Sequence, residues 1–102
     1  MTATVAKTIY QQLGGNRFAA MTGARNLVCG ENYLQFDLPA NFAKRGINKV
    51  RITLEPTDTY TIIFWRFRRK TLELREVDKA EDVYCDQLQE VFTRYTGLDT
   101  RL

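Results

Sequence analysis

The sequence contains no histidine, and only two cysteines and two prolines occur among its 102 residues. Without histidine the chain lacks the commonest general base, the usual activator of a serine or cysteine nucleophile, and every imidazole zinc ligand. Cys29 and Cys85 lie far apart in the sequence and form no CxxC motif. This pattern predicts a non-enzymatic protein with no catalytic residues, no metal and no cofactor. It also predicts a reducing compartment, with both thiols as small buried side chains.

Long apolar runs and phosphate-binding loops are also missing. No segment approaches the roughly 20 apolar residues of a membrane span, and the stretch MTATVAKTIY has no hydrophobic signal region. Neither GxxxxGK[ST] nor GxGxxG occurs. The sequence therefore predicts a cytoplasmic protein that neither contacts a membrane nor binds nucleotides through a glycine-rich loop.

The residues that are present suffice for one domain over residues 1–102. Hydrophobic residues make up 44% of the chain and aromatic residues 12%, which allows a core without disulfides or metal. The net charge is +3, but it is unevenly distributed. Residues 1–77 carry 12 basic and 6 acidic groups, whereas residues 78–102 carry 3 basic and 6 acidic groups. This asymmetry favours a polyanionic partner for the basic part or a basic partner for the acidic part, although a mixed, solvated surface also explains it.

Hydrophobic periodicity predicts a helix at 4–13, in which Val5, Ile9 and Leu13 share one face before a Gly-Gly stop. Apolar and polar residues then alternate as expected for antiparallel strands. We expect the main strands at 33–38, 48–55, 60–67 and 71–77, preceded by shorter strand segments at 17–21 and 27–29 on either side of a turn at 22–26. One helical turn is expected at 41–46, which Asn41 would cap. In the last strand, Leu72 and Leu74 are expected to point inward.

The C-terminal part carries the strongest helix signals. Asp78 and Glu81 form a D-x-x-E capping box, and Gly97 is a typical C-terminal stop. Between them, an apolar stripe is formed by Tyr84, Leu88, Val91, Phe92 and Tyr95. The expected fold is thus α+β: a four- to five-stranded antiparallel meander with an N-terminal and a C-terminal helix.

The segment 60–70, YTIIFWRFRRK, is apolar on both faces of its expected strand and rich in cations. If helices cover only one sheet face, Trp65 and Phe67 are exposed and can stack on unpaired bases. Phosphate contacts would come from Arg51, Arg66, Arg68, Arg69 and Lys70, with Lys49 extending the same face. Two other interpretations stay open: the aromatic residues pack beneath the N-terminal helix, or they form the seam of a homodimer.

An acidic row is expected on the C-terminal helix. It consists of Asp78, Asp82, Asp86 and Glu90, which recur every four residues. Such a stripe can dock on a basic protein, as a phosphate row does, although a solvated helix face explains it equally simply.

Several strings of the sequence are similar to those of a known group of proteins. These are MTGARN at 21–26, GEN at 30–32, LP at 38–39, and NFA at 41–43 followed by GINKVRITL at 46–54. With these strings the chain resembles small, functionally unassigned proteins of bacteriophages and other bacterial mobile elements. The resemblance implies a bacterial cytoplasm and a role around phage replication or host defence, and it provides no binding residues.

Together these observations predict a non-enzymatic accessory protein that contacts single-stranded nucleic acid through the aromatic and basic strand. The alternative is an anti-defence inhibitor or adaptor that docks on a bacterial or phage protein. Its docking surface would be the acidic helix or the aromatic strand.

Overall fold

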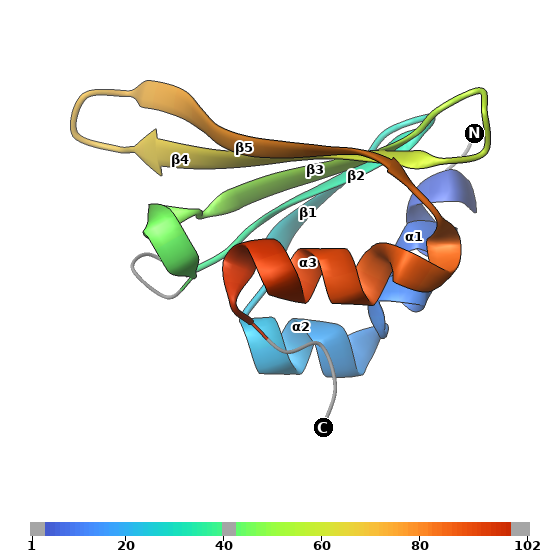
Figure 1. The fold of residues 1–102 in the computed structure, drawn as a ribbon. Helices are drawn as coiled ribbons and strands as arrows, with labels where there is room; N and C mark the ends of the chain where they lie inside the picture. Colours follow the sequence, from blue (N-terminus) through green and yellow to red (C-terminus); the bar gives the residue numbers. More distant parts are fainter. Residues whose placement is uncertain (1–3, 40–42, 99–102) are drawn as a thin grey trace.

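The computed structural model describes residues 4–39 and 43–98, which form a five-stranded antiparallel sheet with helices on one face (Figure 1). The strands are neighbours in the order of the sequence, β1-β2-β3-β4-β5. They are β1 Arg25–Cys29, β2 Tyr33–Asp37, β3 Lys49–Leu54, β4 Tyr60–Arg68 and β5 Glu73–Val83. The predicted α+β class and the antiparallel meander are therefore confirmed.

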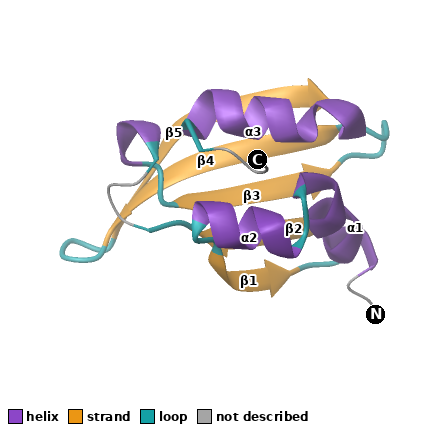
Figure 2. Ribbon diagram, turned by 90° about the horizontal axis from the view of Figure 1, so that it is seen from below, coloured by secondary structure: helices purple, strands orange, loops and turns teal. Residues whose placement is uncertain are grey.

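Three helices cover the same sheet face, as Figure 2 shows from their side: α1 Thr4–Leu13, α2 Asn16–Thr22 and α3 Leu88–Thr96. The N-terminal helix is confirmed at its predicted bounds. The strand predicted at 17–21 is wrong, because this segment forms α2. Phe18 and Thr22 are buried one turn apart, and Gly23 ends the helix with a φ of 74°. No helix in the described ranges has the length and apolar character needed to cross a membrane.

The core lies between the three described helices and the inward residues of β2, β3, β4 and β5. Its centre is a group of phenylalanine rings. The ring centroid of Phe18 lies 5.3 Å from that of Phe36 and 5.5 Å from that of Phe92, in edge-on arrangements that aromatic pairs prefer. At the β4 side, the rings of Phe64 and Tyr95 stack at 5.0 Å. One aromatic cluster thus joins α2, α3 and the sheet.

The C-terminal prediction needs correction. Residues 73–83 form one long strand, β5, and α3 begins only at Leu88, after the short 3-10 helix η2 Cys85–Gln87. The register opposes Ile62 to Ala80 and Tyr60 to Val83, which buries both β5 residues in the core. Pairing with the nine-residue strand β4 therefore outweighs the local capping signal. Tyr84 precedes α3 and is 58% exposed.

The hairpin between β4 and β5 extends beyond the layer of helices (Figure 1). Leu72 is 75% exposed and Leu74 50% exposed, so the prediction that both point inward is wrong. The predicted helical turn appears as the 3-10 helix η1 Lys44–Gly46, and its expected cap, Asn41, lies outside the described residues.

Replacing a ring of the aromatic cluster should cost much more stability than trimming the exposed hairpin. We expect Phe92→Ala to lower the free energy of unfolding by about 3–5 kcal/mol, through lost burial and a cavity. Leu74→Ala should change it by about 0.5 kcal/mol or less. Urea denaturation followed by circular dichroism measures both variants, and equal losses would contradict the position of the core.

Candidate nucleic-acid interface

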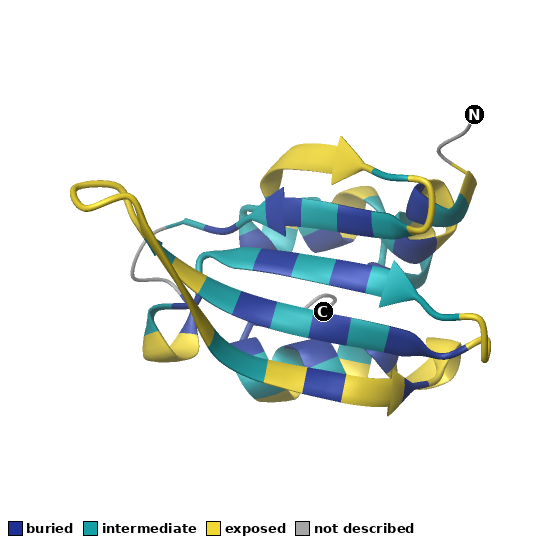
Figure 3. Ribbon diagram, turned by 90° about the horizontal axis from the view of Figure 1, so that it is seen from above, coloured by how far each residue is buried: buried dark blue, intermediate teal, exposed yellow. Residues whose placement is uncertain are grey.

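The sheet face opposite the helices carries no covering element in the described chain (Figure 3). Along β2, β3 and β4, buried residues that face the helices alternate with half-buried residues that face outward. We call this outward side the open face. Its residues are Tyr33, Gln35 and Asp37 on β2, Lys49, Arg51 and Thr53 on β3, and Thr61, Ile63, Trp65 and Phe67 on β4.

Aromatic rings and cations contact one another across the open face. The Arg51 guanidinium carbon lies 4.3 Å from the ring centroid of Tyr33 and 5.7 Å from that of Trp65. Its Nε donates a hydrogen bond of 2.9 Å to Oε1 of Gln35. Two residues before Arg51 on β3, Lys49 Nζ lies 5.9 Å from the ring centroid of Phe67. Cation–π contacts and register thus assemble three rings and two cations into one array.

This arrangement decides one of the open interpretations of the aromatic strand. Ile62 and Phe64 are the β4 residues that are fully buried beneath the helices. Ile63, Trp65 and Phe67 have the opposite orientation and are half-buried on the uncovered side. The interpretation that these three side chains pack beneath the N-terminal helix is therefore wrong. Two interpretations remain, in which they form a ligand-binding surface or a protein interface.

The remaining basic residues of the predicted site do not all lie on the open face. By strand alternation, Arg66 and Arg68 point to the other side of β4. The Arg66 side chain lies against Gly46 of η1, within 3.0 Å of where a Cβ atom would stand. Arg69 and Lys70 are exposed in the turn between β4 and β5. Of the predicted residues, the structure brings together Arg51, Trp65 and Phe67 on the open face and Arg69 at its end.

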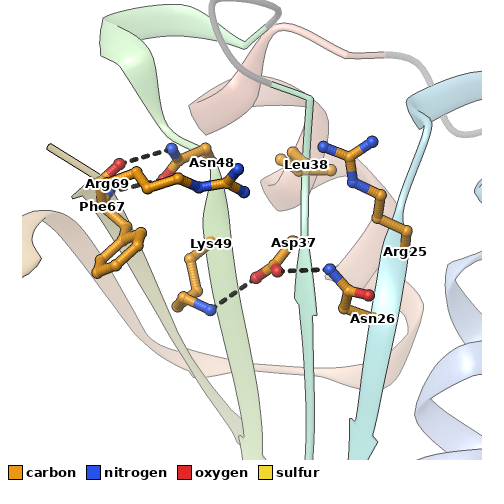
Figure 4. A pocket seen from close by; sticks show the side chains of 8 residues that line it. All are labelled: Arg25, Asn26, Asp37, Leu38, Asn48, Lys49, Phe67 and Arg69. Atoms are coloured by element: carbon orange, nitrogen blue, oxygen red, sulfur yellow. Dashed lines mark hydrogen bonds and ion pairs between the residues drawn. The ribbon is translucent and has the colours of Figure 1, made fainter. Parts of the chain in front are cut away.

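A pocket of about 420 Å³ lies where the open face meets this turn (Figure 4). Asp37 forms its polar centre: Oδ1 accepts a hydrogen bond of 2.7 Å from Lys49 Nζ, and Oδ2 accepts one of 3.0 Å from Asn26. The lining residues are Arg25, Asn26, Asp37, Leu38, Asn48, Lys49, Phe67 and Arg69. Lys49 and Phe67 thus belong to both the open face and the pocket.

Asn48 fixes the β4 segment beside this pocket. Its side-chain Nδ2 donates to the backbone oxygen of Phe67 at 2.9 Å, and the Phe67 backbone N–H donates to Asn48 Oδ1 at 2.8 Å. The amide group thereby replaces a peptide unit at the end of the β3–β4 ladder. This two-way contact holds the backbone of Phe67 in place.

Sequence reasoning missed several residues of this surface. Tyr33 lies within the expected strand at 33–38, but only the β2–β3–β4 pairing shows that it shares Arg51 with Trp65. Arg25 and Asn26 lie between the segments expected to be strands at 17–21 and 27–29, whereas the structure places them at the start of β1. The sequence has no signal that brings them near Arg69. The pocket therefore depends on tertiary structure.

The acidic residues do not form a stripe on one helix, and that prediction is wrong. Asp78 and Asp82 lie on β5, Asp86 lies in η2, and only Glu90 belongs to α3. Asp78 is paired with Arg45 at 2.8 Å, a hydrogen bond that lowers the pKa of its carboxyl group.

The cysteines also depart from the prediction. Cys29 and Cys85 are both exposed, not buried. Cys29 ends β1, an edge strand in which all five residues are exposed. Among residues 4–39 and 43–98, no three cysteine, aspartate or glutamate side chains gather closely enough to hold a metal ion.

Comparisons with protein-family models, with curated proteins and with solved structures find no match to this chain. The open face and its pocket are therefore the features from which a function can be inferred.

The two-way Asn48 contact makes a prediction about stability. Asn48→Ala removes both the donor to the Phe67 carbonyl and the acceptor of the Phe67 N–H, so we expect the free energy of unfolding to fall by about 1–3 kcal/mol. Faster amide hydrogen exchange at Phe67 should accompany this loss. Chemical denaturation and exchange measured by NMR test the prediction, and unchanged protection of the Phe67 amide would contradict it.

Asp37 makes a prediction about pH. Its partial burial favours the neutral acid, but hydrogen bonds from Lys49 and Asn26 and the positive charges of Lys49 and Arg25 outweigh this effect and lower the pKa below 3.8. The ionised carboxylate therefore stabilises the fold at all pH values above about 4, and this contribution is lost as the pH falls through the folded-state pKa.

NMR titration of the Asp37 carboxyl carbon should give a midpoint below 3.8, the ordinary value for aspartate. In Asp37→Asn, the acid-induced loss of stability should be smaller than in the wild type. A midpoint at or above the ordinary value would contradict the described contacts.

Proposed function

We propose that this chain is a non-enzymatic binding protein that holds single-stranded nucleic acid on the open face of its sheet. The observation that supports this most strongly is the array of Tyr33, Trp65 and Phe67 interleaved with Arg51 and Lys49. Proteins bind single strands by combining aromatic rings, on which bases stack, with cations that contact the phosphates.

The geometry of the open face favours unpaired bases over a duplex. Trp65 and Phe67 are two residues apart on one strand, so their Cα atoms are about 7 Å apart, and both point away from the core. Bases within a duplex stack on one another and leave no face free for these rings. The bases of a single strand can be splayed out and stacked on aromatic side chains.

The charges near the array fit a polyanion. Arg51 and Lys49 lie within it, and Arg25 and Arg69 lie at its pocket end. The projecting hairpin adds Lys70 at its turn, and Arg66 and Arg68 on the other side of β4. We assign the direct phosphate contacts to Arg51, Lys49 and Arg69, because these lie on the same surface as the rings.

Docking on a protein is the alternative, and the structure weakens one form of it. The acidic residues are distributed over β5, η2 and α3, and two of them are paired: Asp78 with Arg45 and Glu90 with Arg94, at 2.8 and 2.7 Å. If the chain docks on a protein, the open face is the better candidate for the docking surface. Its partner would be a bacterial or phage protein or a second copy of this chain. A phage or mobile-element origin, as the resemblance implies, is compatible with either function.

Binding of labelled oligonucleotides tests the proposal directly. Fluorescence polarisation at ~50 and ~200 mM salt should show tighter binding to single strands than to duplexes, and the affinity should fall log-linearly with salt as counterions are released. No binding of either form at the lower salt would overturn nucleic-acid binding. Size-exclusion chromatography with light scattering would then test whether the open face pairs two copies.

Trp65→Ala separates stacking from general charge attraction. We expect it to weaken single-strand binding about 5- to 150-fold, the effect of losing one base–aromatic stack, without unfolding the half-buried site. Tyr84→Ala removes an exposed aromatic ring outside β2, β3 and β4 and serves as the matched control. Equal losses in the two variants, with circular dichroism showing both folded, would contradict a role for the open face.

A further inference from the structure

The pocket at the end of the open face has a charge arrangement that the rest of this face lacks. Arg25 from β1 and Arg69 from the β4–β5 turn stand on opposite sides of it, and their guanidinium groups are directed toward the space between them (Figure 4). Within residues 4–39 and 43–98, neither forms an ion pair. The positive charge of Lys49, in contrast, is compensated by Asp37 at 2.7 Å.

We propose that this pocket binds the terminal phosphate of the single strand that lies on the open face, a step that rests on the proposed function. Guanidinium groups bind phosphate oxygens through paired, charge-assisted hydrogen bonds. A phosphomonoester carries about −1.5 to −2 charges at pH 7. This charge matches two arginines that form no ion pair among the described residues, although Arg25 also attracts the Asp37 carboxylate at longer range. An internal phosphodiester carries only one negative charge and matches the pocket less well.

Neighbouring residues give the terminal nucleotide a defined place. Phe67 belongs to the pocket and to the open face. If the terminal base stacks on the Phe67 ring, the next base can stack on Trp65, two residues away on β4. The volume of about 420 Å³ lies within the range of pockets that hold small ligands. Asp37 does not repel the phosphate strongly, because Lys49 and Asn26 both donate to its carboxylate.

The test compares three oligonucleotides of one sequence: with a 5′-phosphate, with a 3′-phosphate, and with hydroxyl groups at both ends. We expect one phosphorylated form to bind about tenfold tighter than the hydroxyl form, and the preferred end gives the direction of the strand. In Arg25→Gln and in Arg69→Gln this ratio should fall to about one or two. Both side chains are exposed, so neither replacement disturbs the core.

Arg17→Gln is the matched control, because Arg17 is an exposed arginine on α2, on the covered side of the sheet. This variant should keep the tenfold ratio. Equal binding of all three oligonucleotides would overturn the terminal-phosphate pocket while leaving the proposed function intact. A preference that both pocket variants retain would also overturn it, since it would reflect general charge attraction.

A second experiment tests phosphate binding in the pocket independently of single-strand binding by the open face. Nucleoside 5′- and 3′-monophosphates are titrated into the protein by calorimetry, with the unphosphorylated nucleoside as reference. Binding of a monophosphate that Arg25→Gln abolishes supports the pocket even if no oligonucleotide binds. Absence of monophosphate binding, together with equal oligonucleotide affinities, overturns it.

Discussion

In the part of the chain that the structure describes, α1, α2 and α3 all lie on one face of the sheet, and this one-sided covering determines the rest of the structure. The helices bury the inward residues of β2, β3 and β4 around the cluster of Phe18, Phe36 and Phe92. Because side chains alternate along a strand, every residue between the buried ones must point away from the helices. A half-covered antiparallel sheet usually has polar residues there. This sheet has polar residues on its open face too, but it also places Tyr33, Trp65 and Phe67 among them.

Strand register then turns these outward residues into a surface of defined chemistry. β3 lies between β2 and β4, so Arg51 reaches a ring on each side. At the end of the same strands, Asn48 fixes the backbone of Phe67, and Lys49 links Asp37 to the aromatic array. The pocket follows from this order, because β1 and the β4–β5 turn bring Arg25 and Arg69 to the same end of the sheet.

Much of this architecture could be predicted from periodicity, since the first helix and the alternation in β2, β3 and β4 depend on local sequence. The C-terminal part could not be predicted, because its D-x-x-E signal is local while β5 is stabilised by pairing with β4 and by burial of Ala80 and Val83. The rings and arginines of β4 could be proposed from composition alone. The contributions of Tyr33, Arg25 and Asn48 depend on strands distant in sequence and required the fold.

Trp65 is the only tryptophan in the chain, which makes its fluorescence a direct probe of the central claim that bases stack on the open face. A single-stranded oligonucleotide should be titrated into the protein at low salt while Trp65 emission is recorded. We expect saturable quenching that weakens as salt is added and is much smaller for a duplex of the same sequence. Binding detected by polarisation without any change in Trp65 emission would contradict it.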